Sequence, residues 1–303
     1  MSSSPSSKAL SGSAFVTLLL IALMMGANHV SARLAFDHGV TVSTAVLFRS
    51  AVTALVVWVI VRVAGVPVNV SAAQRKALLK IGLLIGLQSL CLYSAVARLP
   101  VALALLAFNT YPLWTALWAR TLKGERIEPR VLRAMPVLLL GLALALDVAG
   151  AASGLGASAH WGRIGAGVAF ALTAAASFGL ALVFTQHETL GLDGRVRTAI
   201  TMALVAVAAL IGVVAQGGLA LPNAPIGWWG LAGLTALYGT AFTIMFTVLP
   251  RLGVVGGSPI MNVEPIFALV LAWAVLGQTV AAMQVAGGLL VVATVMWLGL
   301  RRR

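Results

Sequence analysis

Residues 256–277 read GGSPIMNVEPIFALVLAWAVLG, an apolar run with Asn262, Glu264 and Pro265 in its first half. A carboxylate inside such a run is costly in lipid, so Glu264 is expected to face protein or water and is a candidate functional group. Pro265 removes a helical N–H and disfavours helical geometry at the residue before it. The backbone groups freed by such a break are tolerated at membrane depth only where protein buries them or where they line a cavity. The run therefore predicts a functional site inside a membrane span.

An equivalent run lies 153 residues earlier in the chain. At that single offset, and without a gap, the following residues correspond: Asn109 with Asn262, Pro112 with Pro265, Gly124 with Gly277, Gly26 with Gly179, Trp114 with Phe267, and Arg98-Leu99 with Arg251-Leu252. The Asn, Pro and Arg matches carry most weight, because Gly and apolar residues are abundant here. The sequence predicts two homologous five-helix repeats at residues 13–150 and 151–303, after a disordered polar tail at 1–12.

The composition is that of an integral membrane protein. Hydrophobic residues make up 61% of the 303, charged residues 9%, and the mean hydropathy is +1.04. Runs of about 20 apolar residues, enough to span a bilayer, lie at 14–34, 43–63, 78–98, 101–119, 131–149, 165–185, 197–217, 227–248, 257–276 and 280–300. The runs lack the alternating pattern of a barrel strand, so we expect an all-α fold of ten transmembrane helices, five in each half.

The net charge of +13 is explained by topology rather than by nucleic-acid binding, which is not expected. If the N-terminus is cytoplasmic, the inner segments contain sixteen of the twenty basic residues: Lys8, Arg62, Arg75, Lys76, Lys80, Arg120, Lys123, Arg126, Arg130, Arg133, Arg195, Arg197, Arg251, Arg301, Arg302 and Arg303. This positive-inside pattern predicts that both termini are cytoplasmic. Because each half has an odd number of spans, the two repeats are predicted to be inverted.

Several polar and aromatic residues within the predicted spans are candidates to line a substrate cavity with Glu264: Asn28, His29, Gln88, Tyr93, Asn109, Tyr111, Trp114, Tyr238 and Asn262. Packing and interhelical hydrogen bonding remain an alternative for these residues. Pro112 and Pro265 either break their helices or only curve them. Arg49, about 10 Å into its span, can pair with a carboxylate, cap freed carbonyls or snorkel outward.

No signature of catalysis or of nucleotide binding is present. The sequence has no Gly-rich phosphate loop with its Lys, no His-Glu-x-x-His and no metal-spaced Cys or His cluster, and Cys91 is its only cysteine. We therefore expect no enzyme activity, no catalytic residue, no cofactor and no metal site. ATP-driven transport by this chain alone is not expected either.

Ten spans in two inverted halves, Pro112 in the fourth span, Glu264-Pro265 in the ninth and Gly124-Glu125 after the fourth resemble the EamA family of the drug/metabolite transporter superfamily. The resemblance covers nearly the whole chain. It implies a central cavity lined by spans 1, 3, 4, 6, 8 and 9, and transport of small metabolites, mostly outward. One departure is Gly277-Gln278, where the family commonly has Gly-Glu. Gln278 is expected to keep the hydrogen bonds of that turn without the charge.

We therefore expect a multi-pass secondary transporter of the inner (plasma) membrane that exports a small metabolite by alternating access. Amino acids or related compounds are the leading class, and a monomer is expected to suffice. Uptake or flipping of a larger amphiphile, or a non-transporting receptor or interaction subunit, are the alternatives. Two roles are open for Glu264. Its protonation can couple substrate movement to a proton, because a low dielectric favours the neutral acid and a nearby cation favours the carboxylate; or it holds its helix through Arg49 or His29.

Overall fold

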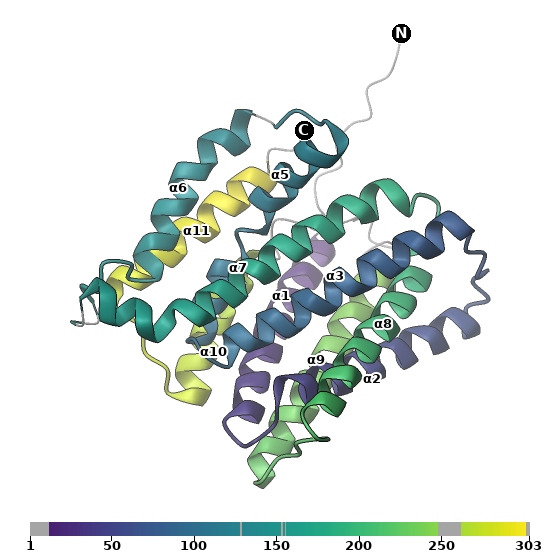
Figure 1. The fold of residues 1–303 in the computed structure, drawn as a ribbon, viewed down its shortest axis with the longest axis horizontal. Coiled ribbons are helices and arrows are strands. Elements are labelled where there is room, and N and C mark those ends of the chain that lie inside the picture. Colours follow the sequence, from purple (N-terminus) through teal and green to yellow (C-terminus); the bar gives the residue numbers. More distant parts are fainter. Residues whose placement is uncertain (1–11, 128, 153, 155, 248–261, 301–303) are drawn as a thin grey trace.

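The computed structural model describes residues 12–127, 129–152, 154, 156–247 and 262–300. Within these residues the regular elements are eleven helices, shown in Figure 1: α1 Gly12–Phe36, α2 Val42–Val63, α3 Ala72–Val96, α4 Val101–Phe108, α5 Tyr111–Lys123, α6 Pro129–Ala145, α7 Ala157–Glu188, α8 Gly194–Ala215, α9 Pro225–Thr247, α10 Glu264–Leu276 and α11 Ala282–Leu300. The predicted tail, apart from Gly12, lies outside the described residues. So do the match of Arg251-Leu252 and the first part of the ninth predicted span.

The described helices are those of a membrane protein. Six segments are long and apolar enough to cross a bilayer: α1, α2, α3, the pair α4–α5, α7 and α8. Shorter apolar helices lie within α6, α10 and α11. Large apolar side chains point outward, including Val63 at 84% and Trp229 at 77% exposure, which suits contact with lipid rather than water. The all-α membrane class is confirmed, while the count of ten spans and the side of each terminus stay predictions.

The fourth predicted span is two helices rather than one. It breaks at Asn109 and Thr110, between α4 and α5. Pro112 lies in the first turn of α5, where its missing N–H has no helical acceptor and its fixed φ suits the start of a helix. The proline therefore begins a new helix, and the break falls before it instead of bending a continuous span.

The described part of the ninth predicted span contains the equivalent of α5. α10 begins at Glu264 with Pro265 in its first turn, and the offset of 153 places Tyr111–Lys123 on Glu264–Leu276, so α5 and α10 are equivalent 13-residue helices. Both end at a glycine in the left-handed region, Gly124 with φ 70° and Gly277 with φ 63°. Glycine adopts this C-terminal conformation without the steric cost of a Cβ.

The packing of the helices has a pseudo-twofold relation. α2 packs on α8 and α6 on α11, while α1 packs on α9 and α10, and α7 packs on α3 and α5. Figure 1 shows α6 beside α11 and α7 along α3. A shift of 153 residues places α1 on α7, α3 on α9, and α5 on α10. The contacts of α1 with α9 and α10 therefore correspond to those of α7 with α3 and α5. This correspondence supports two equivalent halves related by a twofold axis.

Two glycines make the same close crossing in the two halves. A Cβ on Gly26 of α1 would lie 3.0 Å from the Ala268 nitrogen and 3.3 Å from the Phe267 Cβ of α10. A Cβ on Gly179 of α7 would lie 2.8 Å from the nitrogen of Thr115 in α5 and 3.0 Å from the Cβ of Trp114, which are the equivalents of Ala268 and Phe267. In each half a glycine therefore lets one helix approach the helix that begins at the break.

Gln278 joins the two halves at the start of α4. Its Oε1 accepts a hydrogen bond from the N–H of Val101 at 3.0 Å, and Val101 is the first residue of α4. A helix leaves its first N–H groups without an internal acceptor, so this side chain satisfies a group that would otherwise lack a partner. This side-chain bond runs to α4 and not within the turn itself, where the sequence placed it. Glu125, its equivalent, contacts Nε2 of His187 at 2.7 Å.

Candidate functional site

A buried cation lies between the two halves. Arg49 of α2 is 3% exposed, and its guanidinium donates to Ser89 Oγ at 2.8 Å and to the Tyr93 hydroxyl at 3.4 Å. The guanidinium carbon also lies 3.8 Å from the ring centre of Tyr238 on α9 and 4.7 Å from that of Tyr93 on α3. These contacts are cation–π interactions, which are stronger where water is excluded. Arg49 is held in place by neutral groups rather than snorkelling to the surface.

Tyr93 connects this cation to α1. Its hydroxyl donates to Oδ1 of Asn28 at 2.9 Å, and its ring lies 5.4 Å from the ring of His29. Gln88 joins through Ser89, whose hydroxyl donates to the Gln88 Oε1 at 3.2 Å. Five candidates from the sequence, on α1, α3 and α9, are thus brought around Arg49: Asn28, His29, Gln88, Tyr93 and Tyr238.

Glu264 meets His29 at the crossing of α1 and α10. Its Oε1 lies 3.3 Å from His29 Nε2, and the two side chains are 21% and 3% exposed. Glu264 is the first residue of α10, and the positive end of a helix dipole favours a carboxylate there. The carboxylate of Glu264 therefore has both a histidine and a helix N-terminus beside it.

The possible ion pair of Glu264 with Arg49 is not formed. Arg49 has no carboxylate within 4.0 Å among the described residues, and Glu264 pairs with His29. The physical reason is the position of Tyr93, whose hydroxyl and ring contact Arg49 while its ring also lies against His29. Ser89 and the aromatic rings hold the guanidinium, and His29 on α1 faces α10.

The two broken helices meet through Tyr111 and Asn262. The hydroxyl of Tyr111, at the start of α5, donates to the Oδ1 of Asn262, two residues before α10, at 3.4 Å. The Tyr111 ring packs on Phe178 of α7 at 5.1 Å between ring centres. Asn109 lies at the break itself and is 8% exposed. The structure therefore brings Tyr111 to Asn262, as expected for the two breaks.

Trp114 belongs to a separate contact on α7. It stacks on Trp118 with ring centres 6.4 Å apart, and Trp118 Nε1 donates to the carbonyl of Ala176 at 3.0 Å. The backbone crossing at Gly179 places the Trp114 Cβ against this helix. Its described contacts are with α5 and α7, so packing accounts for them.

Sequence reasoning did not select Ser89, Phe178 or Met202, although each touches a candidate. Ser89 accepts from Arg49, Phe178 packs on Tyr111, and the Sδ of Met202 lies 3.8 Å from the Tyr238 hydroxyl. Ser89 carried a signal, since it is a polar residue between Gln88 and Tyr93 in a span. The sequence offered no reason to select Phe178 or Met202, because an apolar residue in an apolar run looks the same whether it packs or lines a site.

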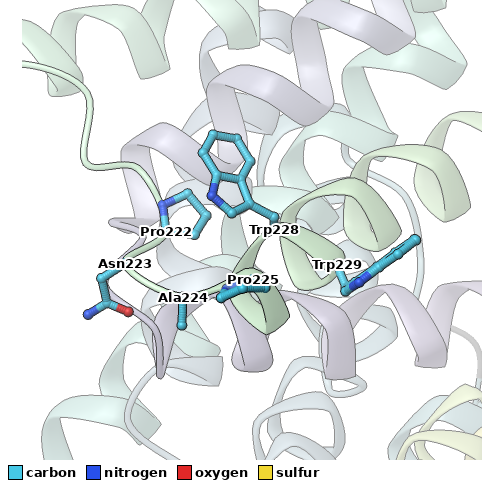
Figure 2. A pocket seen from close by; sticks show the side chains of 6 residues that line it. All are labelled: Pro222, Asn223, Ala224, Pro225, Trp228 and Trp229. Carbon is cyan, nitrogen blue, oxygen red and sulfur yellow. The ribbon is translucent and has the colours of Figure 1, made fainter.

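Two surface hollows lie elsewhere. One of about 420 Å³ is at the start of α9 and is lined by Pro222, Asn223, Ala224, Pro225, Trp228 and Trp229. Figure 2 shows the Trp228 ring above Pro222, with Trp229 pointing away from it. The other, of about 440 Å³, lies against α3 and α8 and is lined by Val68, Val70, Arg75, Leu78, Leu79, Ile200 and Leu204. Neither contains a residue of the Arg49 cluster, in which Arg49, Asn28, His29, Tyr93 and Tyr238 are buried and Gln88 is half-buried.

Comparison with known proteins bears on both the repeat and the fold. The model of a family described as "EamA-like transporter family" matches residues 12–146 and again residues 165–300. The two matches begin 153 residues apart, which is the offset of the internal repeat. A solved structure described as "Crystal structure of protein" is similar, with a TM-score of 0.59 and 19% identity over 95% of this chain and 98% of that one. At this identity the likeness shows the fold alone. No curated protein matches the chain.

Proposed function

The chain belongs to the EamA-like transporter family, and on that basis we propose that it is a secondary transporter of the inner (plasma) membrane that exports a small metabolite. Amino acids or related compounds are the leading class. The observation that carries the proposal is the buried polar cluster of Arg49, Tyr93, His29 and Glu264 at the contact between the two halves. Polar groups at membrane depth between inverted repeats suit a substrate site.

Alternating access follows from the paired crossings. α1 crosses α10 at Gly26, and α7 crosses α5 at Gly179 in the same manner. Because the two halves are built alike, rocking one against the other can exchange the packing at the two crossings and expose the cluster to either side in turn. The closed Arg49 cluster is the state between those exposures.

Counterflow in proteoliposomes tests the transport function. Liposomes that contain the purified protein and are preloaded with one unlabelled compound should accumulate its labelled form transiently, whereas protein-free liposomes should not. The panel covers amino acids, related metabolites and a lysolipid, which tests the alternative of a larger amphiphile. If no compound exchanges, the receptor or interaction subunit becomes the better account.

The proposed topology has ten spans with both termini in the cytoplasm. At one end of the helices, Glu188 contacts Lys80, near the start of α3, at 3.2 Å and Lys123, at the end of α5, at 3.3 Å. At the other end of α3, Arg33 donates to the carbonyl of Leu99 at 3.3 Å. The predicted inner and outer segments thus gather at opposite ends of α3, which supports the positive-inside assignment.

Cysteine labelling tests this topology, and the single native cysteine makes a clean background. In a Cys91→Ser chain, Arg126→Cys is expected to react with an impermeant maleimide only from the cytoplasmic side. Ser158→Cys is expected to react only from the outer side. Both positions are exposed. Reaction of both from the same side of intact cells would refute the arrangement of five spans per half.

A further inference from the structure

The charge of Arg49 is not balanced by any carboxylate in the described part of the chain. The guanidinium is 3% exposed, and the groups that contact it are neutral: two hydroxyls and two aromatic rings. Glu264 pairs with His29, whose ring lies beside that of Tyr93, and it is not within 4.0 Å of the guanidinium. A cation buried in a span without a counter-ion is costly, and cation–π contacts offset only part of that cost.

The same cluster has hydrogen-bond donors without acceptors. Nε of Arg49 and Nδ2 of Asn28 are both buried, and neither has a partner among the described residues. Nδ1 of His29 and Oγ of Ser50, beside them, are also buried without a described partner, but a ring nitrogen or a hydroxyl can be a donor or an acceptor. The residues that carry these two donors share one hydroxyl through their other polar atoms, since Tyr93 accepts from Arg49 Nη1 and donates to Asn28 Oδ1. The large majority of buried side-chain polar atoms in proteins have a partner, so unmet donors beside a buried cation point to a missing anionic acceptor.

The two halves of the protein can open and close this cluster. Arg49 and Asn28 belong to α2 and α1 of the first half, whereas the Tyr238 ring that covers the guanidinium at 3.8 Å belongs to α9 of the second half. Movement of α9 away from α2 would uncover one face of the guanidinium.

We propose that Arg49 and Asn28 bind the carboxylate of the transported compound, which makes carboxylate-bearing metabolites the substrate class. This inference rests on the proposed transport function. A carboxylate supplies two acceptor oxygens and one negative charge, which matches two unmet donors and one cation. A phosphate monoester brings up to two negative charges against one cation, and water brings none. Compounds without an oxyanion, such as simple amines, would leave the guanidinium unbalanced and should be rejected.

Binding to the detergent-solubilised protein tests the site without relying on transport. The probes are matched trios: leucine, 3-methylbutylamine and 4-methylpentanoate; phenylalanine, 2-phenylethylamine and 3-phenylpropanoate; with inorganic phosphate and sulfate as further arms. In each trio, the two compounds that carry a carboxylate should raise the temperature midpoint of unfolding, while the amine should not. Arg49→Gln should weaken carboxylate binding by about tenfold to a hundredfold, as expected for the loss of a charge-assisted hydrogen bond.

Two further variants keep the test decisive if Arg49→Gln folds poorly. Asn28→Asp retains the acceptor for the Tyr93 hydroxyl and places a carboxylate beside the guanidinium, so it should fold and no longer respond to carboxylates. Arg62→Gln is the matched control, because Arg62 lies on the same helix and its guanidinium stacks 5.5 Å from the exposed Trp58 ring. It should bind like the wild type.

The outcomes separate this site from the transport function. A carboxylate-dependent shift that Arg49→Gln removes, with no counterflow of any compound, would keep the site and overturn transport. Counterflow of amines as fast as of their carboxylate partners would keep transport and overturn the site. The site is also overturned if no probe stabilises the wild type, if Arg49→Gln retains the preference for carboxylates, or if inorganic phosphate binds as tightly as the carboxylates in an Arg49-dependent way.

Discussion

Liposomes containing Glu264→Gln are expected to exchange substrate across the membrane but to accumulate none in response to a pH gradient. Coupling to one proton allows about tenfold accumulation per pH unit, so a gradient of 2 units should drive roughly hundredfold accumulation by the wild type and none by the variant. The amide keeps the length of the side chain and its contact with His29 Nε2, 3.3 Å away, and removes only the titrating group. Both are measured on the same liposomes: counterflow shows that the variant is folded and exchanges substrate, and gradient-driven uptake shows whether it is coupled to protons.

The coupling role of Glu264 requires that its surroundings change as the halves move. The titratable groups that interact with it are His29 on α1, Tyr93 on α3 and Tyr238 on α9. Rocking changes the hydration of the α1–α10 crossing, and low hydration favours the neutral acid over the carboxylate. The side chain, 21% exposed here, already reaches the edge of the closed cluster.

A matched carboxyl control is available on α1 and its following turn. Asp37 is exposed and pairs with Arg33 at 2.9 Å, so Asp37→Asn removes a titrating group outside the site and should leave gradient-driven transport unchanged. Unaltered gradient-driven accumulation by Glu264→Gln would refute the coupling role. Loss of folded protein in that variant would instead favour a structural role, in which Glu264 holds α10 to α1.

Gly179→Ala is expected to lower the stability of the protein by about 1–3 kcal/mol, the usual cost of overpacking, and Gly179→Val is expected to prevent folding. The added Cβ would lie 2.8 Å from the backbone nitrogen of Thr115, and backbone has little room to yield. Gly26→Ala should be milder, because its nearest approach, to Ala268, is 3.0 Å. Unfolding midpoints and yields of monodisperse protein in detergent measure both effects.

Gly165→Ala on the same helix is the control for these variants. Its Cβ would meet only the Trp161 ring, at 3.7 Å, which is ordinary van der Waals contact. Alanine is also a better helix former than glycine, so this variant should be at least as stable as the wild type. If Gly179→Ala is as stable as Gly165→Ala, the close crossing of α7 and α5 is not the contact that the geometry describes.

The sequence by itself determined the class of the protein, its internal repeat and the location of its broken helices. These properties depend on chemistry that can be read from a residue and its neighbours. Apolar runs of spanning length indicate a membrane, Pro112 and Pro265 disfavour a straight continuous helix, and one offset of 153 aligns both prolines without a gap. The residues that gather around Arg49 were also among the candidates from the sequence, since a polar side chain inside an apolar run is conspicuous.

Only the tertiary structure decided which of these residues meet. The sequence left both Arg49 and His29 open as partners of Glu264, and the fold places His29 there, with Arg49 between the rings of Tyr93 and Tyr238. The physical reason is that contacts between helices depend on how each is rotated and how closely two axes approach. Those quantities are set by packing at points such as Gly26, where the missing Cβ brings α1 onto α10, and no residue pattern along one helix specifies them.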